Sequence, residues 1–275
     1  MVTMASSVTG DSHHKLEKLQ DHLKQLESVA IAFSGGVDST FLCKVAVDIL
    51  GEKAIAVTAA SSTFPQKELH EAKRLAQEIG ITHIIFPSKE TENKKFIENP
   101  TNRCYYCKRE LFTNICQIAD ENHIAYVLEG SNRDDESDYR PGRKAIAELG
   151  IQSPLRDTGL TKQDIRRLSK EMNLPTWDKP AFACLASRFP YGEKITPEKL
   201  NHIEKAEDFL SSLGFHQYRV RYHGDIARIE VERHEFSKIV ENAETIVKHF
   251  KTLGFTYISL DIEGYRTGSL NKGTI

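Results

Sequence analysis

The stretch AIAFSGGVDST, residues 30–40, decides how the rest of the sequence is interpreted. It continues an apolar run that begins at Val29 and predicts a buried strand, which is followed at once by two glycines and three hydroxyl side chains. In a parallel sheet, ligands bind beyond the carboxyl ends of the strands. Glycines let the backbone approach a ligand closely, and free N–H groups at the start of the next helix favour an anion. The stretch therefore predicts a phosphate-binding loop.

Strands and helices alternate along the first two-thirds of the chain. The residue pattern predicts strands at 29–33, 54–59, 82–87 and 125–130, and helices at 15–28, 41–50, 65–80 and 107–122. This alternation is typical of the α/β class, with an open parallel sheet and helices on both faces. We therefore expect a Rossmann-like domain over residues 15–190.

A different pattern follows Tyr191. It predicts a helix at 197–213, strands at 218–222 and 227–232, a helix at 235–253 and a strand at 257–262. We interpret residues 191–275 as a smaller α+β domain for substrate binding or oligomerisation, with the boundary near residues 189–194. The polar residues 1–14 are expected to be disordered.

Composition excludes several classes of protein. The 275 residues carry a formal net charge of -2, which argues against a protein that coats nucleic acid. Apolar runs are too short to span a membrane, and the N-terminal stretch has no apolar core like that of a signal peptide. These features predict a cytoplasmic protein. Five cysteines, an odd number, fit poorly with a framework of disulfides.

The glycine loop is not a Walker A motif, because no lysine follows the glycines. It resembles SGGxDS, the pyrophosphate-binding loop of the PP-loop ATP pyrophosphatases, which split ATP between its α and β phosphates. The resemblance implies that ATP is held by Ser34, Gly35, Gly36, Asp38, Ser39 and Thr40, with Asp38 also positioning Mg²⁺.

Two further positions follow predicted strands of the same domain. Ser61 follows the second strand, where such enzymes hold adenosine, and Gly130 follows the fourth. Next comes an acidic stretch, residues 134–140, which is either a solvated loop or a set of contacts to magnesium or ligand.

The cysteines fall into two groups. Cys43 and Cys116 lie among apolar residues of predicted helices and are expected in the core. Cys104 and Cys107 form a C-x-x-C pair, and Cys184 lies far away in the sequence. Spacing alone leaves a redox pair and half of a zinc site open. Together the three residues also suit a [4Fe-4S] cluster that has one iron without a protein ligand.

Arginines mark the predicted second domain. Arg219 and Arg221 lie two residues apart on one strand, so their side chains share a face, as a phosphate site requires. The alternative is a surface ladder of ion pairs with Glu230 and Glu232. Arg188 is a further candidate for the same phosphate or for an acyl-adenylate.

Four longer segments resemble the LarE family: PAFACLASRFPYG (180–192), NRDDESDYRPGRKAIAELGIQSPL (132–155), RVRYHGDIARIEV (219–231) and LDIEGYRTGSLN (260–271). The resemblance covers nearly the whole chain past residue 15. LarE is the ATP-dependent sulfur transferase that builds the nickel-pincer cofactor of lactate racemase. It adenylates the carboxylates of pyridinium-3,5-biscarboxylic acid mononucleotide, releasing pyrophosphate, and sulfur then replaces AMP to give the bisthiocarboxylic acid mononucleotide.

The resemblance also implies a sulfur source and roles for individual residues. In one form of the family a single cysteine gives up its own sulfur. In the other, three cysteines hold an iron–sulfur cluster. This sequence is similar to the second form, with Cys104, Cys107 and Cys184 holding a [4Fe-4S] cluster. The family implies catalytic roles for Cys184, Arg188, Glu207 and Glu230, and a substrate-phosphate site of Arg188, Arg219 and Arg221. It further implies a sulfide donor and a homo-oligomer.

Other functions share parts of this pattern. A PP-loop tRNA thiolase would also use three cysteines and a cluster, but it needs a basic RNA-binding face that the net charge of -2 does not favour. Amidating PP-loop synthetases need no C-x-x-C pair. A non-catalytic nucleotide sensor or a cluster-storage protein would release no pyrophosphate.

Overall fold

The computed structural model describes residues 3–137, 141–180, 183–266 and 269, and the chain divides into two compact units. The first unit consists of Met1–Ser61, Gln66–Ser88 and Cys104–Phe182, and the second of Ser62–Pro65, Lys89–Arg103 and Ala183–Ile275. Residues 183–190, which the sequence places in the first domain, belong to the second unit, where Arg188 pairs with Glu207.

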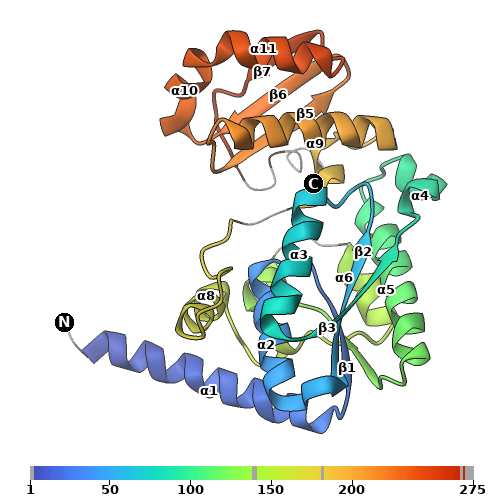
Figure 1. The fold of residues 1–275 in the computed structure, drawn as a ribbon, viewed down its shortest axis with the longest axis vertical. Helices are drawn as coiled ribbons and strands as arrows, with labels where there is room; N and C mark the ends of the chain where they lie inside the picture. Colours follow the sequence, from blue (N-terminus) through green and yellow to red (C-terminus); the bar gives the residue numbers. More distant parts are fainter. Residues whose placement is uncertain (1–2, 138–140, 181–182, 267–268, 270–275) are drawn as a thin grey trace. The chain divides into compact units, whose positions relative to one another are not determined.

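A four-stranded parallel sheet forms the centre of the first unit (Figure 1). Its order is β3-β2-β1-β4, with β1 at Val29–Ala32, β2 at Ala54–Ala60, β3 at Thr82–Pro87 and β4 at Tyr126–Leu128. The predicted α/β class with an open parallel sheet is confirmed. The chain moves outward from β1 to β3 and then returns to place β4 on the other side of β1. This reversal makes the carboxyl end of β1 the switch point at which such sheets bind ligands.

Helices cover both faces of this sheet (Figure 1). Alternate residues of β1 point to opposite faces: Val29 and Ile31 lie in one apolar core and Ala30 in the other. The first core is covered by α1 (Thr3–Gln25), α2 (Val37–Leu50), α3 (Gln66–Ile79) and α8 (Lys162–Glu171). The second is covered by α5 (Arg103–Glu121) and α6 (Gly142–Glu148). The shorter elements of this unit are η1 (Gly51–Lys53), η3 (Arg133–Ser137) and α7 (Pro154–Asp157).

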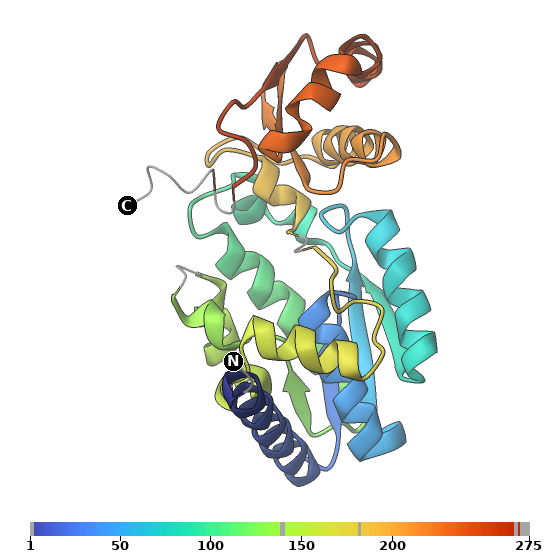
Figure 2. The same cartoon turned by 90° about the vertical axis from the view of Figure 1, so that its left-hand side faces the viewer.

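The second unit contains a three-stranded mixed sheet of order β5-β6-β7. Its strands are β5 (Tyr218–His223), β6 (Ile226–Val231) and β7 (Tyr257–Leu260), with β5 antiparallel and β7 parallel to β6. The light-orange helix α9 (Pro197–Ser212) contacts β5, and α11 (Ala243–Thr252) contacts β7 (Figure 2). The remaining elements are η2 (Glu90–Glu92), α4 (Lys94–Ile97), η4 (Leu185–Arg188), η5 (Arg233–Glu235) and α10 (Phe236–Glu241). The single helix predicted at 235–253 is wrong in one respect, because Asn242 separates α10 from α11.

The N-terminal helix contacts α8. Helix α1 begins at Thr3, although the polar sequence predicts disorder up to residue 14. Buried Ser12 donates a hydrogen bond to Asp164 of α8, and Lys15 pairs with the same carboxylate at 3.1 Å. These long-range contacts join the middle of α1 to the start of α8. Along the described chain, no helix is long and apolar enough to cross a membrane.

Asp164 also closes the capping box of α8, since its carboxylate accepts bonds from the backbone and the hydroxyl of Thr161. Burial alone would raise the pKa of Asp164, but the bonds from Ser12, Thr161 and Lys15 outweigh it and hold the pKa at about 2. A carboxyl group whose pKa is lowered by folding stabilises the fold above its unfolded pKa, and this stability is lost as the pH falls through the folded pKa.

We therefore predict that Asp164→Asn lowers the free energy of unfolding at pH 7 by roughly 2 kcal/mol, the linkage value of a shift from 3.8 to about 2. The difference from wild type should shrink as the pH falls from 4 to 2. Urea unfolding across this range measures it. The control is Asp48→Asn, whose ion pair with Lys44 lies on the surface and should contribute little. A difference that stays constant with pH would contradict the assignment.

Candidate active site

The phosphate-binding loop joins β1 to α2 at the switch point of the sheet. Gly35 has a φ of 66°, and a Cβ atom there would lie 3.2 Å from the Cα of Ala72 in α3. Only glycine adopts this conformation readily at so close an approach. Gly36 is the N-cap of α2, and no side chain in the described part of the protein caps the helix there. The N–H groups of the first turn are therefore left for an anion.

Hydroxyl groups hold the loop in shape. The Oγ atoms of Ser34 and Ser39 lie 3.2 Å apart, and Ser39 Oγ donates to the carbonyl of Gly36 at 3.3 Å. Thr40 is fully buried, and its hydroxyl has no hydrogen-bond partner among the residues that the structure describes. Ser34 and Ser39 thus bond to one another within the loop, while the side chain of Thr40 is buried.

Gly130 brings the end of β4 against the same helical turn. A Cβ atom at Gly130 would lie 3.2 Å from the backbone nitrogen of Ser39 and 3.5 Å from the Cβ of Asp38. Any larger residue would push β4 away from the start of α2. Gly130 therefore lies beside Asp38 and Ser39 of the loop. Ser61 directly follows β2 and is half-buried.

A lysine that the sequence did not single out faces the loop. Lys162, the first residue of α8, donates from Nζ to the carboxylate of Asp38 at 2.6 Å, and Asn132 approaches the same carboxylate at 3.4 Å. Burial raises the pKa of Asp38, and the positive charge of Lys162 opposes this effect. A Walker A motif supplies its lysine from within the loop, whereas here one comes from a helix 124 residues away in sequence.

A second lysine donates a hydrogen bond to the backbone of the loop. Lys179 donates from Nζ to the carbonyl of Gly35 at 3.1 Å and to Glu68 of α3 at 2.7 Å. The capping-box pattern of Thr161 and Asp164 is a sequence signal that could have located the start of α8 and hence Lys162. No comparable signal marks Lys179.

Two aspartates of the acidic stretch after β4 accept hydrogen bonds from backbone nitrogens. Asp135 accepts a bond from the backbone nitrogen of Asn132 at 2.9 Å, and Asp134 accepts one from that of Lys162 at 2.8 Å. Residues 138–140 of the stretch lie outside the described residues. The two aspartates thus help to hold Asn132 and Lys162 beside Asp38.

The C-x-x-C pair occupies the first turn of α5. Cys104 is exposed and Cys107 half-buried, and their spacing places both on one side of the helix. Gly142 of α6 packs on this turn, because a Cβ atom there would lie 3.2 Å from the carbonyl oxygen of Cys104 and 2.7 Å from Cδ of Lys108. Close packing thus fixes the backbone while the thiol of Cys104 stays accessible. The expectation that Cys43 lies in the core is confirmed, since it is fully buried.

Cys184 begins the turn η4 in the second unit and has polar neighbours that the sequence did not predict. Buried Thr63 hydrogen-bonds the thiol and also donates to the buried carboxylate of Glu90, while Arg103 contributes positive charge. Cys184 as a whole residue is exposed, but its sulfur is surrounded by protein atoms, and this burial raises the pKa of the thiol. Arg103 and Thr63 act in the opposite direction. No short-range motif links these residues, which lie in three separate segments.

Arg188 holds the turn that carries Cys184 through hydrogen bonds. Its guanidinium is fully buried and forms two 2.9 Å bonds to the carboxylate of Glu207. It also donates to the carbonyl oxygens of Ala183 at 2.6 Å and Cys184 at 3.1 Å. Glu207 accepts a further bond from the backbone of Val220 in β5, at 2.9 Å. A contact between Arg188 and a ligand phosphate would require some of these bonds to be exchanged.

Arg219 and Arg221 are buried side by side on β5, opposite β6. Arg221 forms a 2.7 Å ion pair with fully buried Glu230, but its Nε is buried and has no acceptor among the described residues. Burial lowers the pKa of Arg219, and the neighbouring charges of Arg188 and Arg221 lower it further. Three guanidinium groups and the carboxylates of Glu207 and Glu230 thus lie close together away from water, which leaves an excess of positive charge.

The alternative, a surface ladder of ion pairs, is right in one respect, since Arg221 pairs with Glu230, but this pair is buried. Arg219 is 8% and Arg221 is 5% exposed, and Glu230 is fully buried. Only Glu232, at the end of β6, lies on the surface as such a ladder would require.

Comparisons with known proteins show what this chain is similar to. A family model described as NAD synthase matches residues 13–103. The chain is 44% identical over 260 residues to an uncharacterized protein of Synechocystis sp., covering 94% of this chain and 97% of that protein. It is 39% identical over 251 residues to the pyridinium-3,5-bisthiocarboxylic acid mononucleotide synthase of Lactiplantibacillus plantarum, covering 90% and 91%. A glutamine-dependent NAD(+) synthetase of Aquifex aeolicus is 35% identical over 112 residues, but these are 40% of this chain and 18% of that protein.

We predict that Lys162→Met weakens the binding of ATP with Mg²⁺ about tenfold or more, a loss of ~1.4 kcal/mol or more, because Asp38 loses its partner and the loop loses a cation. Calorimetric titration measures the affinity. Lys44→Met is the matched control, since Lys44 forms a similar ion pair with Asp48 on α2 but away from the loop. Equal affinities in the two variants would contradict a role for Lys162.

Proposed function

Because the chain belongs to the LarE family, that of the pyridinium-3,5-bisthiocarboxylic acid mononucleotide synthase, we propose that it catalyses the same ATP-dependent transfer of sulfur. Its substrate would be pyridinium-3,5-biscarboxylic acid mononucleotide, and its product the bisthiocarboxylic acid mononucleotide used for the nickel-pincer cofactor of lactate racemase. The observation that carries this proposal is the buried group of Arg188, Arg219 and Arg221, where an Nε–H of Arg221 has no acceptor among described side chains. A phosphate monoester matches that charge and geometry.

The proposed reaction has two steps for each carboxylate. A carboxylate oxygen of the substrate attacks the α phosphorus of ATP, and the bond to pyrophosphate breaks. A sulfur nucleophile then attacks the carbonyl carbon of the acyl-adenylate, and AMP leaves with the original oxygen. Adenylation is needed because oxide is a poor leaving group and AMP is a good one.

Residues of the first unit would handle the nucleotide. Ser34, Gly36 and Ser39 would bind the departing pyrophosphate through hydroxyl and backbone N–H groups. Lys162 would turn from Asp38 toward the phosphates when ATP enters. The carboxylate of Asp38 is a suitable oxygen ligand for Mg²⁺, which would neutralise the polyphosphate charge.

Residues of the second unit would position substrate and sulfur. Arg219 and Arg221 would bind the substrate phosphate. Arg188 and Glu207 would hold the backbone at Cys184, which makes them positioning residues unless their mutual bonds open during the reaction. Glu230 orients Arg221 through their ion pair. A direct acid–base role for Glu207 or Glu230 would need the carboxylate to leave its arginine.

We further propose that Cys104, Cys107 and Cys184 hold a [4Fe-4S] cluster. The donor set fits, since three thiol side chains are available outside the packed core and thiolates are the ligands of such clusters. When bound, the cluster would supply sulfide as the source of sulfur. A sulfide donor, a homo-oligomeric assembly and a cytoplasmic location complete the proposal.

The function is tested by pyrophosphate release. We expect wild-type protein to release pyrophosphate from ATP only when pyridinium-3,5-biscarboxylic acid mononucleotide is present, and mass spectrometry to detect a thiocarboxylate product when sulfide is supplied. Unmodified tRNA, and nicotinic acid adenine dinucleotide with ammonia, serve as comparison substrates. Turnover with either of these and none with the mononucleotide would overturn the proposal.

The cluster is tested on protein purified without oxygen. We expect about four irons per chain and matching acid-labile sulfide, both lost in Cys104→Ser. Cys116→Ser is the matched control, because Cys116 lies on the same helix but packs against the apolar core. If wild type and Cys104→Ser both lack iron, the cluster is excluded, and Cys184 itself becomes the sulfur source.

A further inference from the structure

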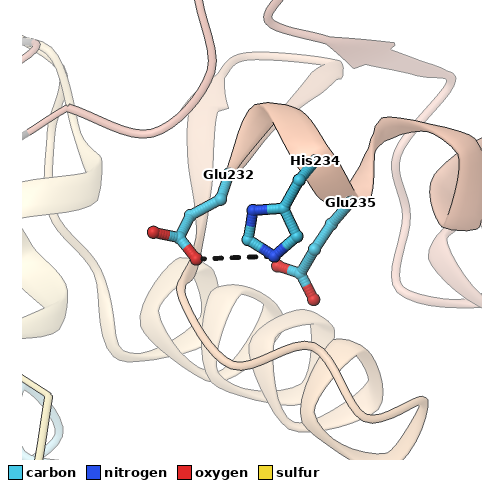
Figure 3. Close-up of side chains that lie close together, drawn as sticks. All are labelled: Glu232, His234 and Glu235. Carbon is cyan, nitrogen blue, oxygen red and sulfur yellow. Dashed lines mark ion pairs between the residues drawn. The ribbon is translucent and has the colours of Figure 1, made fainter.

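A compact group of metal-ligating side chains lies outside the site described above. Glu232, His234 and Glu235 follow the end of β6 and each offers one ligand atom, all within 4.8 Å of one another (Figure 3). Glu232 and His234 lie 3.9 Å apart and are largely exposed, with side-chain exposures of 49% and 74%. The turn η5 brings them together within four residues of sequence, so no long-range folding is needed to form the group.

Glu235 shows that the group is more than a set of surface charges. It is only 7% exposed, and its Oε2 is buried without a hydrogen-bond partner among the described residues. A buried carboxylate without a partner is costly, and such an atom in a native fold calls for an ion or water to satisfy it. Figure 3 shows this carboxylate on one side of the imidazole of His234 and the carboxylate of Glu232 on the other.

We propose that Glu232, His234 and Glu235 form a binding site for a divalent transition-metal ion of the Zn²⁺ type. One imidazole nitrogen and two carboxylates are a donor set that such ions accept. The 3.9 Å between Glu232 and His234 exceeds by little the roughly 3.4 Å between two ligands of a tetrahedral ion, so a small side-chain rotation closes it.

The ion would join the end of β6 to the start of α10. Glu232 is the last residue before η5, and Glu235 is the N-cap of α10, so one ion would bridge both ends of the turn. The exposed side of His234 leaves a fourth coordination position for water. Mg²⁺ should bind poorly, because it prefers oxygen ligands in strict octahedral geometry.

The test titrates Zn²⁺ into full-length protein carrying Cys104→Ser, Cys107→Ser and Cys184→Ser, which removes the thiolates that would compete for zinc. We expect one Zn²⁺ per chain and a rise in the unfolding midpoint with zinc, with no such rise for Mg²⁺. His234→Ala in this background should weaken zinc binding at least tenfold. The matched control is His13→Ala, because His13 forms an exposed pair with Glu171 that belongs to no group of three metal-ligating side chains among the described residues.

A second variant distinguishes a Glu235 that binds metal from a Glu235 that is simply buried as a neutral acid. Glu235→Gln should fold at least as stably as its parent without zinc, because it removes an unpaired buried charge, yet lose the zinc-dependent rise. Equal zinc affinity in His234→Ala and His13→Ala would overturn the site, as would an unchanged zinc-dependent rise in Glu235→Gln. Since the background lacks all three proposed sulfur-chemistry cysteines, neither result depends on the proposed function.

Discussion

The second unit depends on the buried ion pair between Arg188 and Glu207. Breaking such a pair by removing one partner costs about 3–5 kcal/mol, because the remaining charge stays buried. Glu207 also accepts a bond from Val220 of β5, and Arg188 also binds the carbonyls of Ala183 and Cys184. One pair therefore holds together a helix, a strand and the turn that carries the cysteine. Hydrogen bonds from the buried Arg188 guanidinium therefore hold the backbone around Cys184, although Cys184 itself is exposed.

In the first unit, close backbone packing is the corresponding constraint. Gly35 and Gly130 each lie so near another element that a side chain would displace it, and both displacements would distort the loop at the start of α2. Lys162 and Asp38 then set the charge beside this loop. The first unit thus presents N–H groups at the start of a helix, and the second unit contains buried arginines, two of which are paired with buried glutamates.

Sequence patterns predicted what local periodicity and motif spacing determine. They located every strand of both sheets to within a few residues, the loop at residues 34–40 and the shared face of Arg219 and Arg221. They missed contacts that depend on tertiary packing. Lys162 meets Asp38 across 124 residues, and Thr63 reaches Glu90 and Cys184 from a separate segment. The contact between Ser12 and Asp164 likewise joins distant segments, which no local pattern reveals.

Calorimetry of the free substrate distinguishes buried arginines that bind the phosphate of a mononucleotide from arginines that serve only the fold. Pyridinium-3,5-biscarboxylic acid mononucleotide should bind wild type at least 100-fold more tightly than the same nucleoside without its phosphate, a difference of ~2.7 kcal/mol. Arg221→Ala should remove most of that difference while leaving ATP binding unchanged. If the nucleoside binds wild type as tightly as the mononucleotide, the arginine group serves only the fold, and this account of the site is wrong.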